Sequence, residues 1–329
     1  MAEIIYIKEE GPFLEELRQQ LDSFYKPGQD VAIKVHVGEK HNKFHIKADF
    51  VKKIVAMMKE LGLKPFVFES VVVYAGGRDT VEKCLATAKE HGYSEENLGC
   101  PMVVDNDYVE QKTEHFTIQV CRRLAEADGI LVLSHFKGHD CSGIGGAIKN
   151  LCMGFITPKS KEDVHDAGYA VLDESKCTGC GICEKSCPFN LITMEDSKPK
   201  FKACYGCEKC ILNCPEKALS VKTLLFDCGL AEAARAAVAA CSNLFYVNVM
   251  NNVTKHCDCS DDAGPIIAKD AGFLLGTDPV AIDKASHDII VENEGKDVFK
   301  EAHGRPTTLQ IKHGEKIGLG EQKYELVRK

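Results

Sequence analysis

The sequence predicts an α/β protein with a mostly parallel sheet and helices on both faces, interrupted by a small cysteine-rich α+β domain. Three observations predict this class. Short apolar runs alternate with segments of helical period before residue 168 and again after residue 222, an alternation that is typical of parallel sheets. Between these parts, two near-copies of one cysteine pattern stand 27 residues apart. With 329 residues, the chain is long enough for about two domains.

In the first part, the apolar runs predict strands at residues 4–7, 31–37, 65–68, 102–104 and 129–134. Helices are predicted at residues 13–24, 50–61, 80–90 and around 122–127. The helix at 50–61 is the most clearly marked, because its apolar residues repeat on one face and Gly62 follows where a helix would end.

In the second part, the same rhythm predicts a helix at residues 230–241, strands at 244–249 and 272–275, and a helix at 278–291. Asp278 can cap the last helix, and Pro279 suits its first turn. We expect residues 1–167 and 223–329 to fold together as one discontinuous α/β domain, with residues 168–222 inserted into it. The alternative is three domains in series.

Composition excludes several classes of protein. The net charge of −8 and the pI near 5.9 argue against a general nucleic-acid or anionic-membrane surface. There is no basic, apolar leader and no run of about 18 apolar residues, so we expect a cytoplasmic protein that does not enter the membrane. In such a reducing compartment, 17 cysteines are too many for structural disulfides and favour metal-binding thiolates.

Each cysteine pattern has the form C-x2-C-x2-C-x3-C-P. Three closely spaced cysteines can surround three corners of a [4Fe–4S] cluster, while the fourth points towards the other cluster. This exchange predicts two ligand sets: Cys177, Cys180, Cys183 and Cys214 for the first cluster, and Cys204, Cys207, Cys210 and Cys187 for the second. Zinc or disulfides are the alternatives, but they do not call for eight cysteines in a doubled run. The insert resembles the bacterial-type two-cluster ferredoxin domain, so we expect a ferredoxin-like α+β fold with an electron-transfer role.

The loop after the strand at 129–134 is the best candidate for an active site, because ligands bind at the carboxyl ends of parallel strands. It contains the candidate catalytic residues His135, His139 and Lys149. Histidine would act as acid and base, and lysine would hold an anion. Backbone N–H groups near the start of the next helix could bind an anionic ligand or cofactor; the candidate residues are Gly143, Gly145, Gly146 and Asn150. The alternative is a glycine-rich turn with solvated polar side chains.

A third segment, His256-Cys257-Asp258-Cys259, follows the strand at 244–249. Its histidine and thiols could bind an additional metal ion, and the thiols could be redox-active. Incidental cysteines remain the alternative. Six further cysteines lie mostly in apolar surroundings, and we expect them to be small core residues; they are Cys84, Cys100, Cys121, Cys152, Cys228 and Cys241.

Three segments, together with the insert, carry a resemblance over nearly the whole chain: IKVHVGEKHN, SHFKGHDCSGIGGAIKN and DCSDDAGPIIAKDAGFLLGTDPVAIDKASHDII. They resemble the family of iron–sulfur centre proteins known as domain of unknown function 362. This resemblance implies cytoplasmic [4Fe–4S] proteins without an assigned reaction. The stretch from His139 to Lys149 is also similar to a segment of the nickel-pincer lactate racemase family, whose lysine carries the nickel cofactor. Here two residues, not one, separate Gly146 from Lys149.

The first functional hypothesis is a ferredoxin-domain oxidoreductase, in which two [4Fe–4S] clusters supply electrons to a small anionic substrate or cofactor in the α/β domain. A redox partner protein or a small electron donor would reduce the clusters. The alternative is a non-catalytic electron carrier, or a metal- or cluster-handling protein, with an α/β docking domain. An oxygen or redox sensor is a third possibility, although no DNA-binding element is evident.

Overall fold

A sheet of eight strands runs through the larger part of the protein in the computed structural model, which describes residues 1–329. In order across the sheet, the strands are β16 (Tyr324–Arg328), β1 (Ala2–Ile7), β15 (Phe273–Gly276), β14 (Leu244–Val249), β7 (Gly129–His135), β2 (Asp30–Lys34), β3 (Lys64–Glu69) and β4 (Met102–Val104). All neighbours are parallel except at β15, which runs antiparallel to β1 and β14. The α/β class with a mostly parallel sheet is therefore confirmed.

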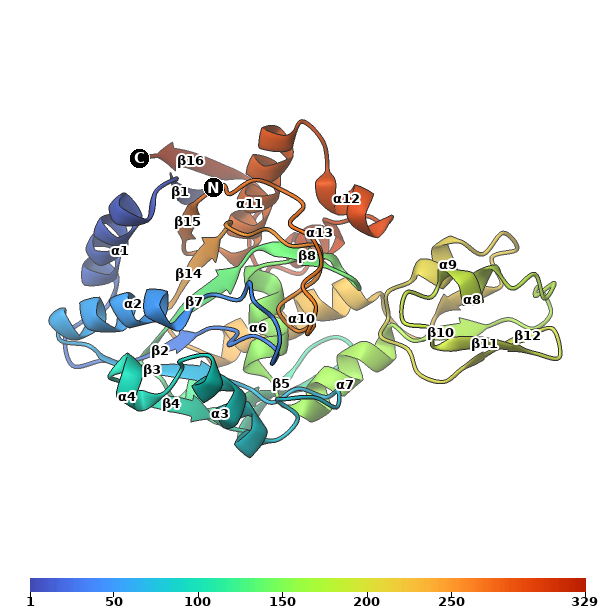
Figure 1. Cartoon of the computed structure of the whole chain (residues 1–329), viewed down its shortest axis with the longest axis horizontal. Coiled ribbons are helices and arrows are strands. Elements are labelled where there is room, and N and C mark those ends of the chain that lie inside the picture. Colours follow the sequence, from blue (N-terminus) through green and yellow to red (C-terminus); the bar gives the residue numbers. More distant parts are fainter.

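Helices cover both faces of the sheet (Figure 1). On one face, α1 (Glu10–Phe24) and α2 (Ala48–Glu60) place apolar side chains such as Phe13 and Ile54 in a core with the strands. On the other face, a second core contains α6 (Ala147–Phe155), α10 (Phe226–Ala240) and α11 (Pro279–Glu294). Asp278 caps α11 as predicted, since its Oδ1 accepts the N–H groups of Val280 and Ala281 at 2.8 and 2.9 Å.

The remaining elements of the body are shorter. They are α3 (Val81–Glu90), α4 (Glu95–Leu98), α5 (Arg122–Ala125), α7 (Pro158–Ala167), α12 (Val298–His303), α13 (Leu309–Lys316), the hairpin of β5 (Tyr108–Lys112) and β6 (Thr117–Cys121), and the hairpin of β8 (Lys137–His139) and β9 (Gly143–Gly145). None of the helices combines the length and the apolar character that a membrane span requires.

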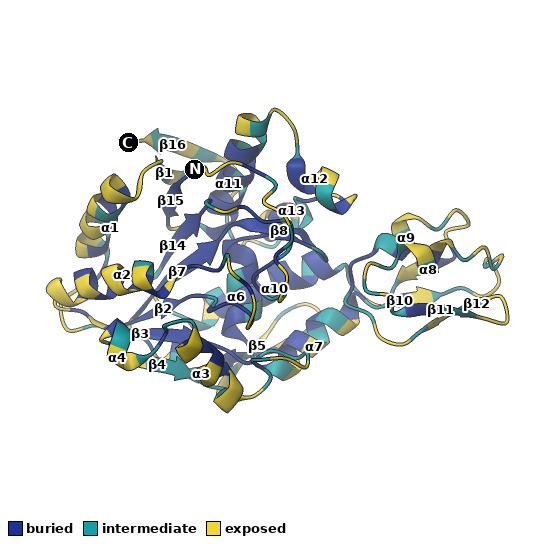
Figure 2. Cartoon of the chain, in the orientation of Figure 1, coloured by how far each residue is buried: buried dark blue, intermediate teal, exposed yellow.

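The two cysteine patterns lie in a small module that extends from one side of the body (Figure 1). Two antiparallel pairs and two short helices form it: β10 (Ala170–Leu172) with β13 (Leu219–Val221), β11 (Ile192–Glu195) with β12 (Lys198–Phe201), α8 (Ile182–Ser186) and α9 (Lys209–Leu212). Its own core is small, and much of its surface is exposed (Figure 2). β7 precedes the module and β14 follows it, yet the two strands are parallel neighbours in the large sheet. The division into domains at residues 167 and 223 stays a prediction.

Candidate functional site

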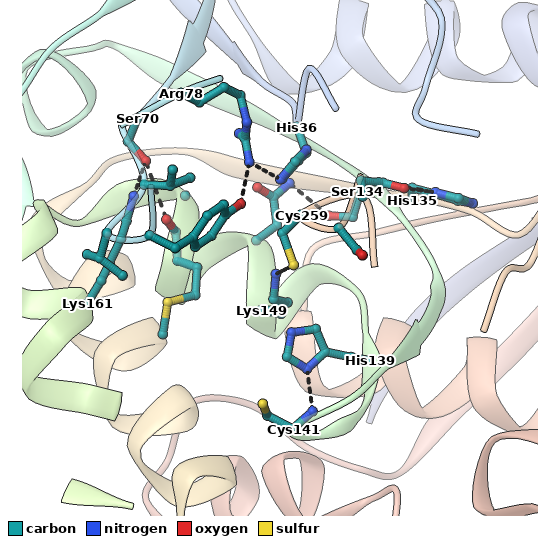
Figure 3. A pocket seen from close by; sticks show the side chains of 18 of the residues that line it. His36, Ser70, Arg78, Ser134, His135, His139, Cys141, Lys149, Lys161 and Cys259 are labelled. Atoms are coloured by element: carbon teal, nitrogen blue, oxygen red, sulfur yellow. Dashed lines mark hydrogen bonds and ion pairs between the residues drawn. The ribbon is translucent and has the colours of Figure 1, made fainter. Parts of the chain in front are cut away.

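A cavity of about 390 Å³ opens at the carboxyl ends of β2, β3 and β7 (Figure 3). The last residues of these strands, Lys34, Glu69 and His135, all line it. Parallel strands bring their carboxyl ends to one edge, which is where ligands bind in open α/β sheets. The cavity also includes Phe189 and Tyr205 from the cysteine-rich module. The body and the module therefore share one cavity.

A buried network of charges forms one side of the cavity. Lys34 Nζ lies 2.9 Å from Glu69 Oε1, and Arg78 NH1 lies 3.3 Å from Glu69 Oε2. Arg78 also pairs with Glu39, while its NH2 lies 3.1 Å from His36 Nε2. Although burial opposes ionisation of Glu69, Lys34 and Arg78 lower the pKa of its carboxyl group. In this network the positive charges of Lys34 and Arg78 are balanced by the carboxylates of Glu69 and Glu39.

The sequence did not single out Glu69 or Arg78. Glu69 ends a strand that reads as purely apolar, and Arg78 follows two glycines in a loop. Nothing local links these two residues to Lys34. The position of Glu69 at the carboxyl end of a predicted strand is the signal that could have found it.

His135 is held at both ring nitrogens. Its Nδ1 lies 2.9 Å from Asp258 Oδ1, and its Nε2 lies 3.0 Å from the carbonyl oxygen of Asn251. Both ring nitrogens therefore have an oxygen atom as partner. Lys137 Nζ approaches the same Asp258 carboxylate at 3.2 Å. In this arrangement His135 positions the Asp258 loop, and it has no free nitrogen for acid–base chemistry.

His139 and Lys149 lie together with the two thiols of the third segment. Lys149 Nζ is 3.2 Å from Cys257 Sγ and 3.8 Å from Cys259 Sγ. One ligand atom from each of His139, Cys257 and Cys259 falls within 4.8 Å of the others. His256 is not part of this group, because its Nδ1 lies 2.8 Å from Asp140 Oδ2. The structure thus brings His139, not His256, to the thiols.

Burial and proximity change the ionisation of this cluster. Burial, with help from Lys149, holds the pKa of His139 well below its ordinary value, so its ring is neutral at pH 7. A hydrogen bond from Cys259, aided by Lys137 and Lys149, lowers the pKa of Cys257. Although burial opposes the charge of Lys149, the two thiols raise its pKa. The thiolate of Cys257 therefore lies beside the ammonium group of Lys149.

The structure does not form the anion site that we expected at Gly143, Gly145 and Gly146. Gly143 and Gly145 belong to β9 and pair with β8, so their backbone groups are used in a hairpin. The first N–H groups of α6 donate to the carboxylate of Asp283, from Ala147 at 2.7 Å and from Ile148 at 2.9 Å. The chain therefore supplies its own anion at this helix start, and no room is left for an external one.

Gly146 shows how closely Asp283 approaches, because a Cβ built on this glycine would lie 2.3 Å from Asp283 Oδ1. Asn150, also predicted to bind a cofactor, instead donates to the carbonyl oxygen of Leu133 at 3.1 Å and to Ser134 Oγ at 3.0 Å. Asn150 joins α6 to the end of β7 at the edge of the cavity.

Two buried lysines in the cavity have no carboxylate partner. One is Lys149, described above. The other, Lys161, reaches from α7 to Ser70 Oγ at 2.8 Å and to the carbonyl oxygen of Val71. Burial lowers the pKa of Lys161 to about 8, so it is charged at neutral pH. Because Lys149 already lies beside the Cys257 thiolate, Lys161 is the cation that favours a small anion in the cavity.

In the module, the cysteines gather as two groups. Cys177, Cys180, Cys183 and Cys214 line one small cavity, although Cys214 belongs to the second pattern. Cys187, from the first pattern, lies close enough to Cys207 and Cys210 to influence their ionisation. An exchange of the fourth cysteines between the two ligand sets stays a prediction, and it requires this proximity.

The backbone around these cysteines suits a bulky inorganic group. N–H groups point at sulfur atoms, from Gly206 to Cys204 at 3.4 Å and from Ala218 to Cys214 at 3.3 Å. Gly179 and Gly206 both have positive φ angles, and so do Gly181 and Glu208, again 27 residues apart. The two halves of the module therefore repeat one loop conformation. The donor set and the loops fit two [4Fe–4S] clusters.

A row of stacked rings joins the second cysteine group to the cavity. The carbonyl oxygen of Tyr205, next to Cys204, lies 3.1 Å from His165 Nδ1. The His165 ring stacks on Phe226 at 4.6 Å between centroids, and Phe226 lies near-parallel to His139 at 6.4 Å. These contacts run from the module to the cluster of His139, Cys257 and Cys259.

Relatives of known sequence match the chain in part. A segment of 58 residues is 41% identical to an uncharacterized ferredoxin from Methanocaldococcus jannaschii, covering 17% of this chain and 35% of that protein. A second uncharacterized ferredoxin from the same organism is 35% identical over 60 residues, which are 16% of this chain and 78% of that protein. The chain thus spans about a third of the length of the first relative.

Among solved structures, the crystal structure of a protein from Thermotoga maritima aligns with a TM-score of 0.48 and 11% identity, covering 88% of this chain and 59% of that one. The family match is broader than the ferredoxin matches. Residues 31–288 match the family described as Domain of unknown function (DUF362), and since this is well over half of its length, the chain belongs to that family.

Proposed function

We propose that this protein transfers electrons through two [4Fe–4S] clusters to a small anionic ligand or cofactor bound in the cavity. Its similarity to ferredoxins supports the iron–sulfur part of this function. The observation that carries the rest is the shared cavity, in which Phe189 and Tyr205 of the module face the charged residues of the body.

The two cysteine groups suggest a direction for electron transfer through the module. Cys177, Cys180, Cys183 and Cys214 would hold the first cluster, and Cys204, Cys207, Cys210 and Cys187 the second. A bound [4Fe–4S] cluster takes up and releases one electron at a time. Cys180 is exposed to solvent, whereas Cys207 packs into the core of the body. A redox partner protein or a small donor would therefore approach the first group, and the rings of His165 and Phe226 connect the second group to the cavity.

The lysines of the cavity would hold the anionic ligand. Lys34, Arg78 and Lys137 are already paired with carboxylates, so they add little net charge. Lys149 lies beside the Cys257 thiolate, so Lys161 remains, and it would compensate negative charge that a ligand brings or gains on reduction. Burial of Lys161 away from bulk water strengthens this attraction.

Raising the pH from 7 to 9 is expected to weaken binding of a small anion, because Lys161 loses its proton near pH 8. The loss amounts to about tenfold in affinity if only the charged form binds. Equilibrium dialysis with radiolabelled sulfate would measure it. The Lys161→Met variant should bind sulfate weakly at both pH values. This result distinguishes an effect of Lys161 from one of Lys34, because burial lowers the pKa of Lys34 as well.

Lys159 is a matched control for Lys161. It lies two residues away on the same helix, but it is exposed and paired with Asp163. Lys159→Met should retain the affinity of the unmodified protein and its loss between pH 7 and 9. An affinity that is equal at pH 7 and 9, or a Lys161→Met variant that binds sulfate normally, would show that Lys161 does not hold the anion.

The proposed function is tested by anaerobic oxidation of reduced methyl viologen in the presence of small oxyanions and 2-oxo acids. We expect turnover with at least one acceptor, and we expect His139→Ala to abolish it while the iron content and the cluster absorbance stay unchanged. If the clusters are reduced by viologen but none of these acceptors is, delivery to a cavity ligand is wrong. The protein would then be an electron carrier.

A further inference from the structure

We propose that His139, Cys257 and Cys259 bind a thiophilic divalent cation such as Zn²⁺, with one coordination position open to the cavity. One nitrogen and two sulfur atoms from these residues lie within 4.8 Å of one another. The side chains come from two distant segments, β8 and the loop after β14, that the fold brings together. This site does not depend on the proposed electron transfer.

The spacing and chemistry of the three residues suit zinc. Zinc bonds of about 2.3 Å to sulfur and about 2.0 Å to nitrogen, in a tetrahedron, separate ligand atoms by about 3.5–4 Å. The ligand atoms already lie within 4.8 Å of one another, so small rotations of the side chains would bring them to that separation. The site is screened from solvent, since Cys257 and His139 are 1% and 6% exposed. Two thiols and one imidazole are a donor set that a borderline-soft cation prefers over Mg²⁺ or Ca²⁺.

The surroundings fix the ligands in place. The Nδ1 side of His139 faces its own loop, where the N–H of Ser142 lies at 3.2 Å and Ser142 Oγ at 3.0 Å. The N–H groups of Cys141 and Ser142 donate to Nδ1, so the loop holds this nitrogen as an acceptor, and Nε2 is the ring nitrogen left for the cation. Figure 3 shows the other side of the ring directed towards Lys149 and Cys259.

Asp258 separates the two cysteines in the sequence but does not join the site. His135 and Lys137 hold its carboxylate, which anchors the loop while both thiols remain near His139. Because the Asp258 carboxylate is engaged elsewhere, the site has three protein ligands. Three protein ligands are typical of zinc sites that bind a water molecule or a substrate at the fourth position, whereas structural zinc sites are closed by four.

Charge identifies the class of ligand for the open position. Two thiolates and a neutral imidazole balance the two charges of the cation. The ammonium group of Lys149, 3.2 Å from Cys257 Sγ, is then left without a counter-charge. His139 and Cys259 line the cavity, and so does Lys161. A small oxyanion or carboxylate would coordinate the cation and lie between these two lysines.

The site is tested on the full-length, cluster-containing protein under anaerobic conditions with ZnCl₂ as the probe. We expect one zinc per chain after gel filtration, in addition to the iron. X-ray absorption at the zinc edge is specific for this element in the presence of iron, and it should show two sulfur and two nitrogen or oxygen neighbours. His139→Ala and Cys259→Ser should each weaken zinc binding at least tenfold and leave the iron content unchanged.

His256→Ala and Cys141→Ser are matched controls, because both residues lie near the site without contributing to it. Their zinc affinity should equal that of the unmodified protein. Failure to bind zinc would overturn the proposal, and so would four sulfur neighbours, which would locate zinc at the cluster cysteines. Zinc binding that survives both His139→Ala and Cys259→Ser, or a native disulfide between Cys257 and Cys259 found by mass spectrometry, would also overturn it.

Discussion

Replacing Arg305 with alanine is expected to lower the free energy of unfolding by about 3–5 kcal/mol, because it leaves buried carboxylates without a counter-charge. Arg305 is fully buried and forms ion pairs with Asp227 and, at 3.6 Å, with Glu208. Its NH1 also lies 3.4 Å from the carbonyl oxygen of Cys207. Cys207 and Glu208 belong to the module and Asp227 to α10, so this arginine joins the two parts of the protein.

The loss should depend on pH. Burial raises the pKa of Asp227 to about 7 even beside Arg305. A carboxyl group with a raised folded-state pKa binds its proton more tightly in the folded state, so its effect on stability becomes less favourable as the pH rises from about 4 to 7. Without Arg305, the pKa of Asp227 rises further and this window extends above pH 7. Arg305→Ala should therefore be more destabilising at pH 8 than at pH 5.

Urea unfolding of the cluster-containing protein, followed by circular dichroism at both pH values, measures this effect. Arg18→Ala is the control, because Arg18 pairs with Glu60 at 2.6 Å on the surface. An exposed pair of this kind contributes less than about 1 kcal/mol. A loss below 1 kcal/mol for Arg305→Ala at pH 8 would show that the buried pair does not join the module to the body.

The sequence predicted those parts of the fold that depend on local pattern. Apolar runs located β1, β2, β3, β4, β7, β14 and β15, and Asp278 caps α11 as its position before Pro279 indicates. The direction of β15 was not predictable in the same way. β15 follows β14 without an intervening helix, and a parallel neighbour would require a crossover connection. β16, near the end of the chain, is only half-buried and has a weak apolar pattern.

The site was predicted in pieces. His139, Lys149 and the pair Cys257 and Cys259 were each identified, but their meeting depends on contacts between residues more than 100 positions apart. The same holds for Asp283, which reads as one polar residue on a helix yet caps α6. The glycines before α6 indicated an anion site; the anion proved to be a side chain of the protein itself.

Replacing a single cluster ligand is expected to have a large effect on the iron content of the protein. Two [4Fe–4S] clusters correspond to about eight iron atoms per chain. Cys187→Ala and Cys214→Ala should each leave about four, because each variant loses one ligand of one cluster. Cys241→Ala, a cysteine outside the module, should leave the iron content unchanged. Iron and sulfide analysis after anaerobic purification measures this directly.

Double variants then decide whether the fourth cysteines are exchanged. If Cys187 belongs with Cys204, the variant lacking both should retain about four iron atoms, whereas the variant lacking Cys177 and Cys187 should lose nearly all. Without exchange, these two results would be reversed. The position of Cys187 near Cys207 and Cys210 favours the first outcome. Because Cys187 lies two residues before Phe189 in the cavity wall, its loss should also stop viologen-dependent turnover, even though the first cluster remains.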